Sequence, residues 1–184
     1  MDPFVATLNY IFALGVIVLL VVSLGLLGVY AYERVRRVRT SVGGLVGKFS
    51  LFLVFVLTFM AATLSLVYSE IFGFIPCGLC WFARIFMFSQ VFVSAGALVM
   101  RDKIFAPVYL MTLSVAGMIV TLYHHYIQMG GSEVVACPAS SVSCAQRIIF
   151  EFGFITFPLL GFSLFAFIFV LLLLQGSHRK ELSI

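Results

Sequence analysis

With 184 residues, of which 63% are hydrophobic and 10% charged, this chain is too apolar to enclose its side chains in a water-soluble core. A net charge of +4 would suit an acidic or nucleic-acid partner in a soluble protein, but here the basic residues lie beside apolar stretches and indicate membrane topology. We therefore expect a membrane protein that lies in the lipid bilayer and binds no nucleic acid.

Five apolar runs are long enough to cross a bilayer, whose core of about 30 Å needs about 20 helical residues. Backbone groups in lipid must be satisfied within each segment, and the runs lack the two-residue alternation of barrel strands, so each is expected to be a helix. The expected spans are Leu8 to Tyr30, Leu51 to Ser69, Trp81 to Met100, Ile104 to Ile127 and Phe152 to Leu174.

The distribution of basic residues predicts the orientation of these spans. By the positive-inside rule, the stretch at 31 to 50, the turn after the third span and the C-terminal tail lie in the cytoplasm. Only Arg84 and Arg147 remain for the other side, so the N-terminus and all four cysteines are expected outside, where disulfides persist. The first run has no Lys or Arg ahead of it and exceeds an h-region, so we interpret it as a retained span. The expected cytoplasmic residues are Arg34, Arg36, Arg37, Arg39, Lys48, Arg101, Lys103, Arg179 and Lys180.

Cys77 and Cys80 form a C-x-x-C pair in the segment IPCGLCWFARIFMF, where Pro76 ends the preceding structure and the third helix begins around Cys80. The free N–H groups and partial positive charge of a helix N-terminus favour a thiolate over a thiol. The pair is thus placed for thiol–disulfide exchange, although an inert disulfide or half of a zinc site remains an alternative for an isolated C-x-x-C.

Arg84 follows Cys80 by one helical turn, on the same helix face and about 6 Å deeper in the apolar layer. No acidic residue within that span can neutralise it, and ionisable residues inside a membrane usually mark a ligand or ion path. We interpret its guanidinium as a hydrogen-bond donor to a quinone carbonyl. The alternative is a side chain that extends to the membrane interface.

Cys137 and Cys144 form a second pair in the polar segment ACPASSVSCAQR, within the external connection at 128 to 151. A disulfide between them would contribute about 2–3 kcal/mol at most, so it is not needed to hold a membrane bundle together. Pro138 and the serines that follow favour an irregular loop that an outside thiol can attack. The sequence leaves the pairing of the four cysteines open.

His124 and His125, between Tyr123 and Tyr126, end the fourth span on the side of the cysteines. One interpretation is an interfacial belt, and the other is a hydrogen-bond partner or proton donor for a quinone. Adjacent side chains on a helix point about 100° apart, so at most one histidine faces the site. A zinc ion held by the four cysteines would need them reduced in an oxidising compartment, so no metal is expected.

These residues resemble the disulfide-bond formation protein B/C family, the quinone-linked DsbB and BdbC membrane oxidoreductases. The resemblance covers roughly residues 50 to 174 and rests on PCGLCWFARIFMF, the short basic turn after it, the histidine-tyrosine cluster, the loop with two cysteines and FGFITFP. It implies an all-α membrane protein with a four-helix transmembrane bundle at 50–184. An additional N-terminal transmembrane helix and a basic cytoplasmic loop would occupy 1–49.

The resemblance also implies a thiol:quinone oxidoreductase of the cell membrane that reoxidises a thioredoxin-fold thiol oxidase of the DsbA/BdbD type. In this scheme the partner attacks Cys137, and electrons pass through Cys144 to Cys77. The quinone is ubiquinone or menaquinone, which the sequence does not distinguish. The implied quinone contacts are Cys80, Arg84 and His124.

Two alternatives to this function stay open. A relative of vitamin K epoxide reductase also couples quinone-type chemistry to cysteines, but there the C-x-x-C would be expected towards the end of the bundle. A non-catalytic membrane scaffold with structural disulfides is the second alternative. Its disulfides would resist mild reduction, whereas catalytic ones would not.

Overall fold

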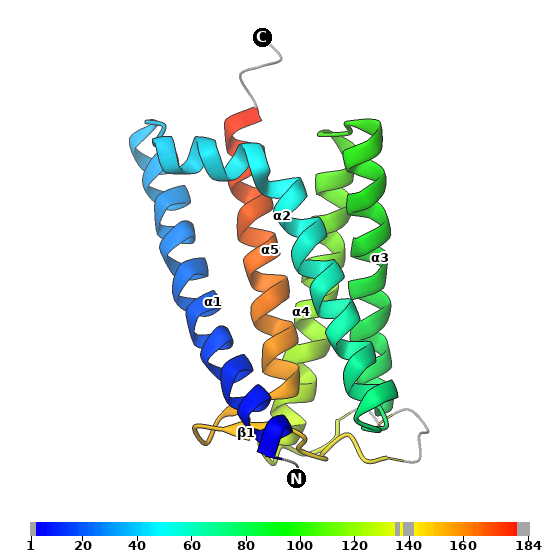
Figure 1. The fold of residues 1–184 in the computed structure, drawn as a ribbon. Coiled ribbons are helices and arrows are strands. Elements are labelled where there is room, and N and C mark those ends of the chain that lie inside the picture. Colours follow the sequence, from blue (N-terminus) through cyan, green and yellow to red (C-terminus); the bar gives the residue numbers. More distant parts are fainter. Residues whose placement is uncertain (1–2, 135–136, 138–141, 180–184) are drawn as a thin grey trace.

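The structure, a computed structural model, describes residues 3–134, 137 and 142–179. In this part of the chain, five long helices run side by side as a bundle (Figure 1). All five are long and apolar enough to cross a membrane, which confirms the expected all-α membrane fold. Pro138, the two serines that follow at 140 and 141, and Lys180 lie outside the described residues. The elements are α1 (Pro3–Arg36), α2 (Ser41–Leu66), a π-helical turn (Val67–Ile71), α3 (Gly78–Met100), α4 (Phe105–Gln128), β1 (Phe150–Glu151), β2 (Ile155–Thr156) and α5 (Phe157–Arg179).

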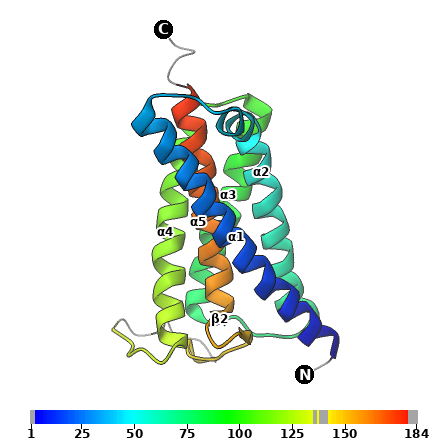
Figure 2. The same ribbon diagram turned by 90° about the vertical axis from the view of Figure 1, so that its left-hand side faces the viewer.

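Four of the helices form a closed ring. α2 packs on α3, α3 on α4, α4 on α5, and α5 again on α2. α1 lies against α5 on the outside of this ring and crosses it at an angle (Figure 2). The bundle is therefore a four-helix core with one added helix, as the family resemblance implies. The apolar side chains of α5 that are most deeply buried in this core are Phe165, Ile168, Leu171, Leu172 and Leu174.

The connection expected at 31 to 50 is mostly helical, which corrects the interpretation of the sequence. α1 continues to Arg36 and α2 already begins at Ser41, so only a short turn separates them. The Glu33 carboxylate accepts hydrogen bonds from the backbone N–H and the hydroxyl of Thr40, the residue that caps α2. Hydropathy indicates how much of a helix lies in lipid, but it does not indicate how far the helical hydrogen bonds continue beyond the lipid. The helices therefore extend further than the apolar runs predicted. The first turns of α2 run across the top of the bundle before the helix descends (Figure 1).

α5 begins at Phe157, later than the expected start of the last span at Phe152. Phe152 and Gly153 have φ values of +53° and +77°, which do not start a right-handed helix, and they lie in the turn of the β1–β2 hairpin. Pro158 then falls in the first turn of α5, where its missing N–H costs no helical hydrogen bond.

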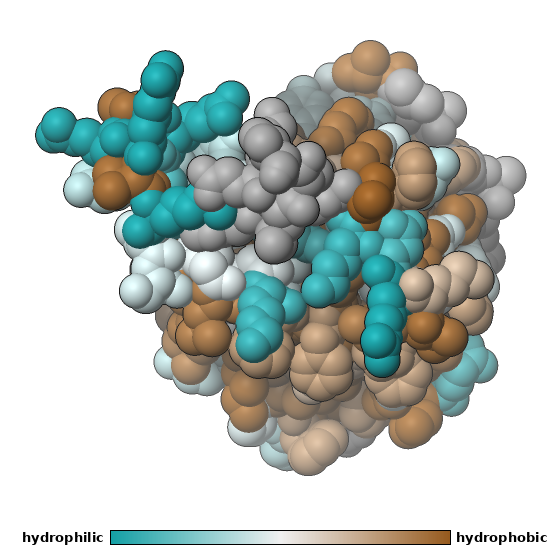
Figure 3. Space-filling model, turned by 90° about the horizontal axis from the view of Figure 1, so that it is seen from above, coloured by the Kyte–Doolittle hydropathy of each residue, from teal (hydrophilic) through white to brown (hydrophobic). Residues whose placement is uncertain are grey.

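The two ends of the bundle carry different chemistry. The α1–α2 turn lies at the end where α5 finishes, and Arg34, Arg36, Arg37 and Arg39 are exposed there. A view onto this end shows hydrophilic side chains gathered among hydrophobic ones (Figure 3). The beginning of α3, the end of α4 and the hairpin lie at the opposite end of the bundle, together with the N-terminus (Figure 1). The C-x-x-C pair is therefore separated from the exposed arginines by the length of the helices.

Candidate functional site

The first cysteine pair lies at the N-terminus of α3. Cys77 is the N-cap residue, so the helix begins directly after it rather than around Cys80 as the sequence predicted. The Cys77 sulfur accepts a hydrogen bond from the Cys80 backbone N–H at 3.4 Å, and the two sulfur atoms are 2.9 Å apart. Backbone N–H groups in the first turn of a helix have no helical partner, and they give this end a partial positive charge. The site therefore favours negative charge on sulfur.

The electrostatics of this pair favour a thiolate on Cys77. The hydrogen bond from the Cys80 thiol holds the pKa of Cys77 well below its usual range. Burial of the Cys77 side chain acts in the opposite direction, and the nearby His124 lowers the pKa further. In the reduced pair, Cys77 is thus the sulfur that loses its proton first.

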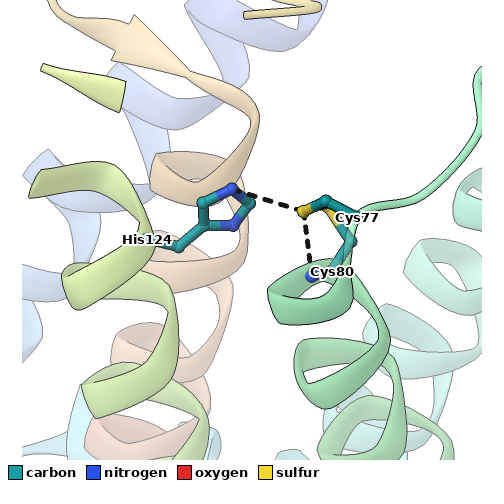
Figure 4. Close-up of side chains that lie close together, drawn as sticks. All are labelled: Cys77, Cys80 and His124. Atoms are coloured by element: carbon teal, nitrogen blue, oxygen red, sulfur yellow. Dashed lines mark hydrogen bonds between the residues drawn. The ribbon is translucent and has the colours of Figure 1, made fainter. Parts of the chain in front are cut away.

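α4 directs His124 towards the cysteines and His125 away from them. His124 Nε2 lies 3.6 Å from Cys77 Sγ and 3.0 Å from the carbonyl oxygen of Cys144. Figure 4 shows the ring reaching from α4 to Cys77 at the start of α3. Because a carbonyl oxygen only accepts, the contact with Cys144 requires a hydrogen on Nε2. His125 instead pairs its Nδ1 with the Thr156 hydroxyl at 2.7 Å.

The second cysteine pair is a disulfide between Cys137 and Cys144, while Cys77 and Cys80 are free. This answers the question of pairing that the sequence left open. Cys144 is buried in the same apolar cluster as Cys77, and Cys80 and Cys137 pack against that cluster. Both pairs therefore lie in one cluster, with His124 in contact with each.

Arg84 is buried in the bundle, and α2 supplies its partner. Its Nε donates to the Ser65 hydroxyl at 2.7 Å, and its Nη2 donates to the Ser65 carbonyl oxygen at 2.6 Å. The guanidinium carbon also lies 5.2 Å from the centre of the Trp81 ring, within cation–π range. The side chain thus turns towards α2 instead of extending to the interface.

A cavity of about 300 Å³, lined by residues of all five helices, connects these groups. Cys77, Cys80 and His124 line it near the hairpin end of the bundle, and Arg84 lines it further into the bundle. Most of its other lining side chains are apolar. Small-molecule sites are typically about 300–1,000 Å³ and mostly apolar with a few polar groups, so this cavity suits a small apolar ligand.

Tyr68 and Gln128 are among the polar residues that line the cavity and that the sequence analysis did not single out. The Tyr68 hydroxyl donates to Asn9 Oδ1 at 2.7 Å. Gln128 is buried and donates from Nε2 to the carbonyl oxygen of Gln146 at 2.7 Å, but its Oε1 accepts no hydrogen bond within the described part of the chain. A buried acceptor without a partner is costly unless a ligand or water satisfies it. The polarity of Tyr68 within an otherwise apolar span is a signal that could have identified it, whereas Gln128 falls at the start of the expected polar connection, where polarity gives no such signal.

Two cysteine pairs in contact at one end of a helical membrane bundle define a membrane thiol–disulfide protein. The family model "Disulfide bond formation protein DsbB" matches residues 47–175, and the chain belongs to this family. The family and the names of its relatives thus support an oxidoreductase role in disulfide formation at the membrane. The match begins within α2, so α1 lies outside it.

Named relatives agree with the family assignment. The chain is 38% identical over 134 residues to the SPbeta prophage-derived disulfide bond formation protein B of Bacillus subtilis (strain 168), which covers 70% of this chain and 88% of that protein. It is 37% identical over 134 residues to a probable disulfide formation protein of Oceanobacillus iheyensis, covering 71% and 92%. It is 40% identical over 120 residues to a probable disulfide formation protein C of Halalkalibacterium halodurans, covering 64% and 87%. No solved structure matches this chain.

Proposed function

We propose that this chain oxidises the dithiol of a soluble or anchored thioredoxin-fold protein of the DsbA/BdbD type and passes the two electrons to a membrane quinone. One observation carries the proposal: the two cysteine pairs share one packed cluster, and the cavity that begins at Cys77 and Cys80 continues past a buried Arg84. An electron path from an outside thiol to an apolar ligand needs this continuity.

The first exchange takes place at the Cys137–Cys144 disulfide. A thiolate of the partner attacks the Cys137 sulfur and Cys144 leaves as a thiolate. The second partner thiol then displaces Cys137, so the partner leaves as a disulfide and this pair becomes a dithiol. Cys137 is only partly buried whereas Cys144 is fully buried, which supports attack at Cys137.

The second exchange passes the electrons to the C-x-x-C pair in its oxidised form. Cys144 attacks Cys77, and the bond between Cys77 and Cys80 breaks, which leaves Cys80 as the free thiolate beside the cavity. Cys137 then attacks Cys144, so the loop disulfide forms again and Cys77 and Cys80 end as a dithiol. The His124 N–H faces Cys77 and favours negative charge on it when it leaves. When bound, the quinone accepts the two electrons and two protons of this dithiol.

The cavity has polar groups that fit a quinone. The Nε and Nη2 groups of Arg84 donate hydrogen bonds to Ser65. Within the described residues Nη1 donates none, so it can donate to a ring carbonyl of the quinone. The unpaired Gln128 Oε1 can accept a hydrogen bond from a hydroxyl of the reduced ring. Ubiquinone and menaquinone share these carbonyl and hydroxyl groups, so both are candidates.

We also propose that the cysteine end faces the extracytoplasmic side of the cell membrane, with the N-terminus outside and the C-terminus in the cytoplasm. The exposed arginines at the opposite end support this orientation under the positive-inside rule. The division into a unit at 1–49 and a catalytic domain at 50–184 is part of the proposal. It is supported by the family match at 47–175 and by the position of α1 outside the ring.

The test uses the purified full chain in lipid nanodiscs, mixed with a reduced thioredoxin-fold protein and a quinone. Quinone absorbance should fall in proportion to the partner thiols that are oxidised, and Cys80→Ser should stop both. His125→Ala, whose side chain faces the hairpin, serves as the matched control and should keep the activity. Full activity of Cys80→Ser, or thiol oxidation without quinone reduction, would contradict the proposal. Thiol trapping in graded redox buffers distinguishes the proposed enzyme from a non-catalytic scaffold, because the disulfides of a scaffold would resist mild reduction.

A further inference from the structure

α1 contributes to the cavity although it lies outside the four-helix ring and outside the family match. Its Phe12 and Leu19 line the cavity opposite residues of α2. α1 packs along α5 and makes only a few contacts with α2, as the two ribbon views also show (Figures 1 and 2). The part of the cavity that α1 lines is therefore bounded by α1, α2 and α5.

This part of the cavity is apolar and deep. From Ser65, which holds Arg84, α2 continues to line the cavity back to Leu57, a distance of about 12 Å along the helix. A flat ring held by Arg84 would leave this depth unfilled. The apolar lining side chains here are Phe12, Leu19, Leu57, Met60, Leu64 and Leu160.

The same part of the cavity opens at the side of the bundle. Met60 lines it and is still 55% exposed, on the surface of a membrane-spanning helix. A ligand dissolved in the bilayer can therefore enter between α1 and α2 without crossing water. Such a ligand must be apolar along its length, because the lining residues offer it few polar partners.

α1 is held in place by a hydrogen bond and by apolar packing against the rest of the bundle. Asn9 accepts a hydrogen bond from Tyr68 of the π-helical turn at 2.7 Å. On the same helix face, one and two turns further along α1, Ala13 and Val16 are buried in a cluster with Ile155 and Leu159 of the hairpin and α5. The wall formed by Phe12 and Leu19 is therefore fixed relative to the rest of the cavity.

On the basis of the proposed function, we propose that α1 forms one wall of the site for the isoprenoid tail of the quinone, and that Leu19 and Phe12 select quinones by that tail. The continuity of the apolar part with the Arg84 end supports this occupant over a lipid acyl chain. α1, which lies outside the family match at residues 47–175, thus contributes to the specificity of the site for its quinone.

The experiment compares two quinones with the same ring: menadione, which has no isoprenoid tail, and a menaquinone that carries one. Leu19→Trp should fill the opening and raise the KM for the tailed quinone about tenfold, with the KM for menadione unchanged. Val18→Trp is the matched control, because Val18 is 59% exposed beside Leu19 and does not line the cavity; it should change neither KM.

Leu19→Ala provides a second variant if the tryptophan impairs folding. Removing the leucine contacts should raise the KM for the tailed quinone about three- to tenfold, again without an effect on menadione. Equal changes for both quinones, no change for either, or a copurified lipid that a tailed quinone does not displace would overturn the inference. A wild-type chain that reduces neither quinone would instead overturn the proposed function.

Discussion

The Cys77 sulfur lies 3.6 Å from Nε2 of His124, and the same nitrogen lies 3.0 Å from the carbonyl oxygen of Cys144. One N–H group of α4 therefore faces both cysteine pairs, which belong to different segments of the chain. A donor in this position stabilises a thiolate on Cys77 and holds the backbone of Cys144 close to it. The exchange between the pairs depends on these contacts, and the predictions below test them.

The reactivity of Cys77 should depend on pH in a way that His124 and Cys80 control. Because the pKa of Cys77 is lowered, wild-type Cys77 should remain a thiolate, and react with iodoacetamide, well below the usual thiol pKa of about 8.5. Cys80→Ala should move the alkylation profile to higher pH by the larger amount, because the hydrogen bond from Cys80 is the largest cause of the low pKa. His124→Ala should move it less. Peptide mass spectrometry of the reduced, alkylated protein measures each profile.

His125→Ala is the control for this series, since its side chain pairs with Thr156 instead of a cysteine. Its alkylation profile should match that of the wild type. Profiles that stay the same in both His124→Ala and Cys80→Ala would show that neither contact stabilises the Cys77 thiolate.

Arg84→Lys should weaken quinone binding while leaving the exchange with the partner protein intact. A lysine cannot donate to both Ser65 atoms and keep a planar donor for a ring carbonyl. Loss of one hydrogen bond to a charged group corresponds to an increase in quinone KM of about 10- to 100-fold. Steady-state kinetics at varied quinone measure it, and a single turnover of the reduced partner without quinone is the control. A lower rate in that single turnover would place Arg84 in the thiol exchange instead.

A chain with only Cys77 and Cys144 should form a disulfide between them under mild oxidation. The variant is Cys80→Ser with Cys137→Ser, and the expectation follows from the shared cluster of the two remaining cysteines. Mass spectrometry of peptides cut without reductant detects the bond. The matched variant, Cys77→Ser with Cys144→Ser, leaves Cys80 and Cys137 and should form its bond more slowly. The opposite order of rates would rule out Cys144 as the residue that attacks Cys77.

Gly117→Ala should destabilise the contact between α4 and α5. A Cβ at this position would lie 2.6 Å from the ring of Phe165, which is fully buried. The expected loss is about 1–3 kcal/mol, because the packed core must shift. Gly96→Ala is the matched control: no heavy atom lies within 4 Å of its added Cβ, and alanine favours the helix by up to about 1 kcal/mol. Reversible unfolding in mixed micelles measures the free energy of unfolding of both variants. Equal free energies would show that α4 and α5 do not pack at Gly117.

Short-range signals in the sequence were sufficient to predict the five spans. They also predicted that the C-x-x-C lies near a helix start and that the basic residues lie apart from the cysteines. Hydropathy and the exclusion of charge from lipid act on each segment by itself, so they can be interpreted without the fold. The same signals misplaced helix ends, since α1 continues to Arg36 and α2 begins at Ser41, within the polar stretch where the apolar residues stop.

The tertiary structure decided the contacts between helices. The bond from Arg84 to Ser65, the bond from Tyr68 to Asn9 and the choice of His124 over His125 all depend on how each helix is rotated about its axis. Helices that are apolar on every side carry little periodicity that would reveal this rotation. Only the packing of the helices against one another, which brings segments distant in the sequence together, sets which polar side chains meet.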